Sequence, residues 1–189
     1  MWGLWFAIGI GAAAVLGAVA WAFRRPEADD PEWRAAFDAT QAQAQADPRK
    51  AWAAAVYPLT VGEADPGARP KYATALLAGL GITDAVSFER AVAELAGGDD
   101  SAWPLVRAIA LWRVGVGRGW CADDQAWGHI WPLCRALQAR YSDFEHLAAD
   151  YLRGLRAAGR PEARAHHTEQ TVITLRAEVW PEVAYGQAI

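Results

Sequence analysis

The sequence predicts an all-α protein, with one N-terminal transmembrane helix followed by a compact multi-helix domain. Three observations predict this class. Residues 2–23 carry no charged side chain, several later stretches repeat their apolar residues every three or four positions, and helix-capping residues separate those stretches. The expected organisation is a transmembrane anchor over 1–25, a joint over 26–30 and a helical domain over 31–189.

The apolar N-terminal segment is long enough to cross a bilayer, since a helix over 2–23 spans roughly 33 Å. Tryptophans stand near both ends, where indole rings prefer the membrane interfaces. Arginines follow the segment and no basic residue precedes it, so the positive-inside rule places the N-terminus outside and the domain in the cytoplasm. The expected interface residues are Trp2, Trp5, Trp21, Arg24 and Arg25.

Two other interpretations of this segment stay open. A cleaved secretory signal could end at Ala18-Val19-Ala20, although the segment lacks the basic start and the shorter apolar core of such signals. Small residues recur four positions apart, a spacing that lets two copies of a helix pair but that also arises by chance in an alanine- and glycine-rich span. A homo-oligomer through this helix is therefore one expectation.

In the first half of the domain, aspartate–proline pairs mark helix starts. Asp30-Pro31 and Asp47-Pro48 each combine an N-cap with a residue favoured in the first helical turn. Glycine and proline predict a loop over Pro58 to Pro70, and Gly81-Ile82-Thr83 predicts a helix end followed by a cap. The helices expected here cover 31–46, 48–57, 71–80 and 84–96.

The second half has clearer helical periodicity. Helices are expected over 102–116 and 123–140, each with apolar residues at steps of three and four. Ser142 and Glu145 match a capping box that opens a further helix. Residues 171–179 alternate between apolar and polar side chains, which predicts a short strand or an extended tail.

Composition excludes several kinds of protein. The chain has a net charge of −4. Arg24 and Arg25 are the only charged residues among the first 25, so the other 16 Arg and Lys residues face 22 Asp and Glu residues, a net charge of −6. An acidic domain is poorly suited to phosphate backbones, so no nucleic-acid partner is expected. Cys121 and Cys134 are too few for a disulfide scaffold.

A tryptophan-dense stretch around a glycine-rich turn at Gly115 to Asp124 is the candidate binding surface. The tryptophans could line a partner groove or a pocket, or could serve only as core. Each of two arginines could bind an anion, or could pair with a carboxylate while its stem packs on apolar surface. The surface comprises Trp103, Arg107, Trp112, Arg113, Trp120, Asp123, Trp127 and Trp131.

The residues assign no catalytic group, cofactor or metal. Asp123 and Asp124 could act as acid and base, but carboxylates at a helix start have a structural role there. Four residues have the ligand types of a zinc site, but their spacing matches no zinc motif. They are Cys121, His129, Cys134 and His146.

The order of several short motifs carries a resemblance. Trp103-Pro-Leu-Val-Arg107-Ala-Ile is followed by Ala126-Trp127, Tyr141-Ser142-x-Phe144-Glu145 and Tyr151-Leu-x-Gly154. This order resembles the bacterial family catalogued as domain of unknown function 1266, over roughly Leu76 to Arg156. The resemblance implies a helical fold, with no established activity, and in a bacterium the predicted anchor would lie in the inner membrane. Departures from the family pattern are Pro104 for an aspartate, Ala122 for a serine cap and Phe144 for a tryptophan.

The features together favour an interaction or scaffolding module at the cytoplasmic face of the membrane, with an unidentified protein partner. An enzyme or small-ligand binder with a pocket at the Gly115–Asp124 turn, using Arg107, Arg113 and Asp123, is the main alternative. A deep polar pocket holding those three side chains would favour this alternative, whereas an exposed apolar groove would favour the module. A component of a bacterial conflict system, such as an immunity protein, is the third hypothesis.

Overall fold

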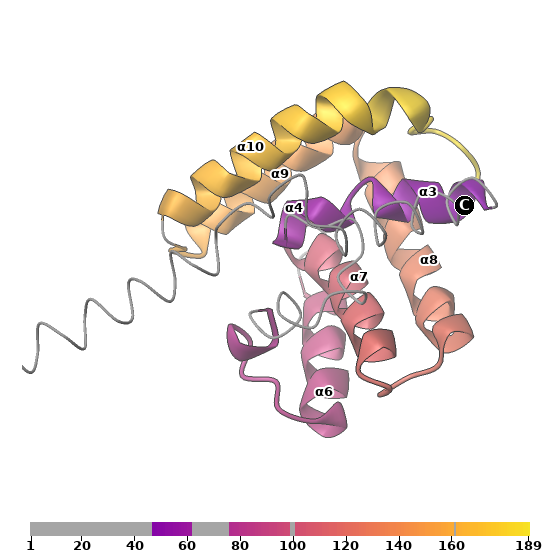
Figure 1. The fold of residues 1–189 in the computed structure, drawn as a ribbon, viewed down its shortest axis with the longest axis vertical. Helices are drawn as coiled ribbons and strands as arrows, with labels where there is room; N and C mark the ends of the chain where they lie inside the picture. The colour runs from indigo at the N-terminus through magenta and orange to yellow at the C-terminus, as the bar shows by residue number, and fades with distance from the viewer. Residues whose placement is uncertain (1–46, 62–75, 99–100, 161) are drawn as a thin grey trace, which may run out of the picture. The chain divides into compact units, whose positions relative to one another are not determined.

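The structure, a computed structural model, describes residues 47–61, 76–98, 101–160 and 162–189. These residues form seven α-helices and one 3₁₀ helix and contain no strand, which confirms the all-α class for this part of the chain (Figure 1). In chain order the elements are α3 (Pro48–Ala54), α4 (Tyr57–Val61), α6 (Ala85–Ala96), α7 (Ala102–Gly117), α8 (Asp123–Arg140), α9 (Phe144–Ala157), α10 (Glu162–Glu178) and η1 (Trp180–Glu182).

The predicted transmembrane segment over 2–23, the joint over 26–30 and the helix expected over 31–46 lie outside the described residues. Where the structure does describe the chain, no helix is both long enough and apolar enough to cross a membrane.

The central helix is α7, which packs against α4, α6, α8 and α9 (Figure 1). Twelve of its residues are buried, from Ala102 to Gly115. Because other helices surround α7 on several sides, more of its residues are buried than the one stripe that its apolar periodicity predicts. The buried residues include two arginines, Arg107 and Arg113. The predicted stripe consists of Leu105, Ile109, Trp112 and Val116. The predicted bounds of α7 and α8 agree with the structure to within one residue.

Local signals place the starts of the shorter helices. The Asp47 carboxylate caps α3 by accepting from the Arg49 backbone N–H at 3.1 Å, and Pro48 fills the first position. Gly81, with a φ of 67°, adopts the left-handed conformation expected at the predicted stop. The predicted loop from Pro58 was placed too early, because Pro58 is the second residue of α4, where proline costs a helix no hydrogen bond.

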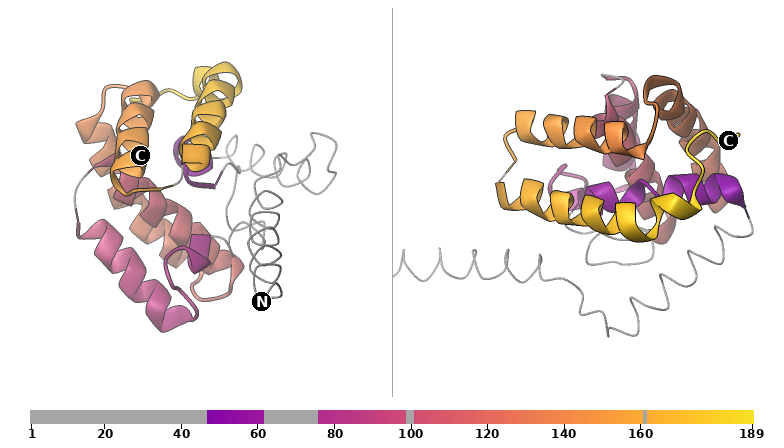
Figure 2. Two further views of the ribbon diagram at one scale, coloured as in Figure 1. Left: turned by 90° about the vertical axis from the view of Figure 1, so that its left-hand side faces the viewer. Right: turned by 90° about the horizontal axis from the view of Figure 1, so that it is seen from above.

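The predicted C-terminal strand is wrong. Residues 171–178 belong to α10, which runs beside α9 (Figure 2). Ala165, Thr168 and Leu175 are buried, and their spacings of three and seven residues are those of one helix face. A helix satisfies its own backbone hydrogen bonds, whereas a lone strand would leave its groups unpaired. Packing against α9 and α4 therefore decides the conformation.

Candidate functional site

The eight residues of the predicted binding surface fall into three separate groups. Arg107 and Arg113 lie six positions apart on α7, which turns their side chains about 120° apart and separates them by about 9 Å along the axis. The first group contains Trp103 and Arg107. The second contains Arg113, Asp123, Trp127 and Trp131, and the third contains Trp112 and Trp120.

The first group lies where α7 meets α9. The Arg107 guanidinium stacks over the Trp103 ring at 4.6 Å, and the Trp103 and Tyr151 ring centroids are 5.1 Å apart. A Cβ at Gly154 would lie 2.4 Å from the Cβ of Trp103, so only glycine permits this approach of the two helices. The motif Tyr151-Leu-x-Gly154 is therefore explained by packing.

Arg107 is 92% buried, with an exposed fraction of 8%. Within the described part of the chain its guanidinium makes no hydrogen bond and no ion pair, so the expected carboxylate partner is absent there. Burial lowers the pKa of Arg107, and the positive charges of Arg160 and Arg164 lower it further, while Tyr151 opposes this shift.

The second group joins α3, α7 and α8 through ion pairs and stacked rings. The Arg113 guanidinium is 2.5 Å from the Asp123 carboxylate and 5.0 Å from the centroid of the Trp127 ring. Lys50 lies 4.0 Å from the same carboxylate and 5.0 Å from the same ring, while Trp131 stacks on Trp127 at 4.5 Å. For Arg113, pairing with a carboxylate is confirmed.

The surroundings of Asp123 favour the charged form of its carboxylate. Burial raises its pKa, but the hydrogen bond and charge of Arg113 and the charge of Lys50 outweigh burial, so that the pKa is lowered. A general acid or base near neutral pH needs the opposite shift. Asp123 therefore fits the structural interpretation, an anion at the N-terminus of α8.

The third group is aromatic packing around α6. Phe88 meets the Trp112 ring edge-on at 5.3 Å and lies 5.5 Å from Trp120. The Cys121 thiol donates to the Trp112 carbonyl at 3.9 Å, and burial raises its pKa, which keeps it protonated and a weak nucleophile. Across the described residues, no three His, Cys, Asp or Glu side chains gather as a metal site.

A hollow of about 330 Å³ lies elsewhere, at the junction of α9, α10 and η1. We call it the aromatic hollow. Phe144 stacks on Trp180 at 5.5 Å, and Tyr185 meets Phe144 edge-on at 4.9 Å. Sequence reasoning missed it, although Trp180-Pro181 marks its position. The lining residues are Asp143, Phe144, Glu145, Arg176, Trp180, Pro181, Val183 and Tyr185.

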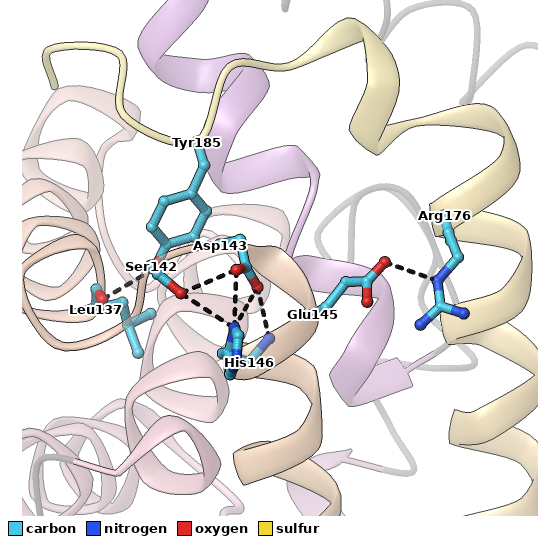
Figure 3. Close-up of polar contacts among 7 residues, drawn as sticks. All are labelled: Leu137, Ser142, Asp143, Glu145, His146, Arg176 and Tyr185. Carbon is cyan, nitrogen blue, oxygen red and sulfur yellow. Dashed lines mark hydrogen bonds and ion pairs between the residues drawn. The ribbon is translucent and has the colours of Figure 1, made fainter.

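Hydrogen bonds fix the rings of the aromatic hollow. The Tyr185 hydroxyl donates to the Leu137 carbonyl at 3.0 Å (Figure 3). The Trp180 indole N–H donates to the Ala55 carbonyl at 3.1 Å. At the rim, Arg176 donates to the Glu145 carboxylate at 3.0 Å (Figure 3). The tail after α10 is thus anchored to α3 and α8.

The predicted capping box at Ser142 and Glu145 is displaced by one residue. Asp143 is the N-cap of α9 and accepts from the His146 backbone N–H at 2.8 Å, while Glu145 pairs with Arg176 instead (Figure 3). Ser142 and Asp143 both contact the same ring nitrogen, Nδ1 of His146, at 3.0 Å and 2.7 Å. In a Ser-His-Asp catalytic triad the serine and the aspartate bond to opposite nitrogens of the histidine ring. Because Ser142 and Asp143 share one nitrogen, we interpret this cluster as a helix cap.

We expect the Asp143→Ala variant to lose about 1 kcal/mol of unfolding free energy at pH 7, since it lacks the N-cap. Hydrogen bonds from His146 lower the pKa of Asp143 to about 2. The stabilisation is therefore complete above the ordinary pKa of 3.8 and is lost as the pH falls through about 2. Urea denaturation at pH 7 and pH 2 tests this, with the substitution of an exposed carboxylate on α6, Glu89→Ala, as control. A difference that persists at pH 2 would contradict it.

The family model described as "Protein of unknown function (DUF1266)" matches residues 19–178. The match extends beyond both ends of the stretch over Leu76 to Arg156 that carries the resemblance. No curated protein and no solved structure matches the chain.

Proposed function

Because the chain belongs to the DUF1266 family, whose description assigns no activity, we propose a function from the geometry. The protein is an interaction module, held by residues 2–23 at the cytoplasmic face of the bacterial inner membrane. Its helical domain binds a segment of another protein there.

The aromatic hollow is the observation that carries this proposal. Pro181 is exposed and Val183 and Tyr185 are half-buried, so apolar surface stays open to a partner. Its volume of about 330 Å³ is at the lower end of ligand pockets, which suits one or two apolar side chains. Aromatic rings around a small hollow are typical of binding hot spots.

The charges near the hollow indicate the chemistry of the partner. Asp143 stays ionised at neutral pH and stands at the rim, and the chain as a whole is acidic. A partner segment with a basic residue beside an apolar anchor would complement both features. The enzyme alternative receives less support, because Arg107 lies in a different group from Arg113 and Asp123.

Site-specific photocrosslinking in the native cells tests the proposal. We expect a full-length chain with benzoylphenylalanine at Val183, in the hollow, to give one discrete crosslinked product in the membrane fraction. The same group at Glu94, exposed on α6, should not give it. A Leu16→Arg substitution should release both chain and product from the membrane, because a charge at mid-bilayer costs about 3 kcal/mol.

Two results would contradict parts of this proposal. Equal crosslinking from Val183 and Glu94, or none from either, would exclude the hollow as a docking site. A wild-type chain found in the soluble fraction would exclude the membrane tether while leaving the hollow testable.

A further inference from the structure

An ion pair lies at the rim of the aromatic hollow. Glu145, in the first turn of α9, and Arg176, in the last turn of α10, both line the hollow and point toward each other (Figure 3). The Nε of Arg176 lies 3.0 Å from an oxygen of the Glu145 carboxylate. A guanidinium of this chain therefore stands at the hollow that also contains the rings of Trp180 and Tyr185.

This ion pair is weak enough to be exchanged. The side chains of Arg176 and Glu145 are 58% and 57% exposed, so water screens their attraction and the pair contributes little free energy. The Arg113 side chain, by contrast, is only 8% exposed in its pair with Asp123, and breaking that pair would leave a charge out of water. A second cation can therefore replace Arg176 on Glu145 at small cost.

The rim carries more negative than positive charge. Asp143 is a second carboxylate in the lining, and hydrogen bonds from His146 lower its pKa to about 2. Burial raises the pKa of Tyr185, and the charge of Asp143 raises it further, so the negative potential reaches the ring inside the hollow. His146 offsets this charge only when it is protonated. Two carboxylates therefore face one guanidinium, which favours a cation from outside.

The aromatic rings favour arginine as that cation. A guanidinium is planar, stacks on aromatic faces and binds a carboxylate with two parallel hydrogen bonds, which the ammonium group of lysine cannot do. The same chemistry occurs elsewhere in this protein, where the Arg107 guanidinium lies 4.6 Å from the centroid of the Trp103 ring. An arginine side chain in the hollow would place its stem on the rings and its guanidinium at the carboxylates of the rim.

We propose that Arg176 is a built-in competitor at the aromatic hollow, and that an arginine of the partner segment replaces it on Glu145. The inference rests on the proposed function, because it names the basic residue that the partner inserts and the residue of this chain that opposes its binding. The exchange is favourable since the incoming arginine gains the ring surface of the hollow together with the Glu145 carboxylate. Arg176 thereby selects for segments that carry an arginine beside their apolar anchor.

Photocrosslinking of a defined peptide to the full-length chain in mild detergent tests the proposal. The chain carries benzoylphenylalanine at Val183, and the probe is biotinyl-leucyl-arginine amide, titrated at pH 8, where histidine side chains are mostly neutral. The citrulline analogue of the peptide has the same shape without the charge. We expect Arg176→Gln to lower the half-saturating concentration of the arginine peptide about threefold, as expected on removing an exposed competing pair, and to leave the citrulline peptide unaffected.

Two further variants separate competition at Glu145 from a general change in charge. Arg90→Gln removes an exposed arginine of α6 outside the hollow, so it changes the net charge as Arg176→Gln does and should leave binding unchanged. Glu145→Gln should weaken binding of the arginine peptide several-fold. In that background Arg176→Gln should have no further effect, because the two substitutions act on one pair.

The outcomes distinguish this inference from the proposed function. If the arginine peptide binds better than the citrulline peptide but Arg176→Gln leaves its binding unchanged or weakens it, Arg176 is not a competitor, and the hollow remains a docking site. A tightening that persists when Glu145 is replaced would also overturn the inference, because it would show a long-range effect of charge. No crosslink with either peptide in any variant would overturn both the inference and the docking site.

Discussion

Replacing Trp52 with alanine is expected to lower the free energy of unfolding by about 4 kcal/mol, the range for a fully buried large aromatic. Trp52 has an exposed fraction of 0%. Its ring lies 5.6 Å from both Phe144 and Tyr185, and its indole N–H donates to the Tyr185 carbonyl at 3.0 Å. The substitution therefore opens a cavity and also removes one of the two hydrogen bonds described between α3 and the C-terminal tail, while the bond from Trp180 to Ala55 remains.

Urea denaturation followed by far-UV circular dichroism measures this loss. Trp52→Phe keeps an aromatic ring and loses the hydrogen bond, so it should cost less than half as much. The alanine variant should also expose the tail near Tyr185 to proteolysis. A loss below 1 kcal/mol would show that the tail and α3 do not depend on each other for stability.

The second large effect is expected at Asp150, where an alanine substitution should cost about 3 kcal/mol. The Asp150 carboxylate is buried and accepts the Ala102 backbone N–H, at the start of α7, at 2.8 Å. It also accepts the Tyr141 hydroxyl and pairs with Arg153. Burial raises the pKa of Asp150, but these donors outweigh burial and lower it, so the group is an anion that stabilises the N-terminus of the central helix.

Chemical denaturation of a matched series distinguishes the parts of this network. Asp150→Asn keeps one acceptor and should cost less than alanine. Arg153→Gln should cost under about 1 kcal/mol, because the Arg153 side chain is 73% exposed and water screens its ion pair. If Arg153→Gln cost as much as Asp150→Ala, the ion pair rather than the helix start would be the source of stability.

Local chemistry explains why much of the helical pattern could be predicted. Asp47 before Pro48, and the left-handed Gly81, act within a few residues of their own positions. Such signals do not depend on the rest of the fold. The motifs of the family resemblance differ, because Gly154 and Trp103 meet only where two helices approach closely.

The candidate surface could be predicted only in part, because residues near in sequence turn in different directions on a helix. Arg113 and Asp123 do meet, whereas Arg107 stacks on Trp103 where α7 meets α9. The aromatic hollow is marked in the sequence only by Trp180-Pro181, because its residues come from α9, α10 and the tail.

The sequence by itself determined the all-α class, the family and most helix bounds, because capping, glycine conformation and apolar periodicity are local properties. Tertiary structure alone decided that residues 171–178 are helical and that Arg107 is buried without a carboxylate partner in the described chain. Both outcomes depend on a neighbour distant in sequence, which is α9 beside α10 in the first case and α9 beside α7 in the second. A short alternation of apolar and polar residues does not indicate which distant helix will pack against it, and neither does a single arginine on an apolar helix.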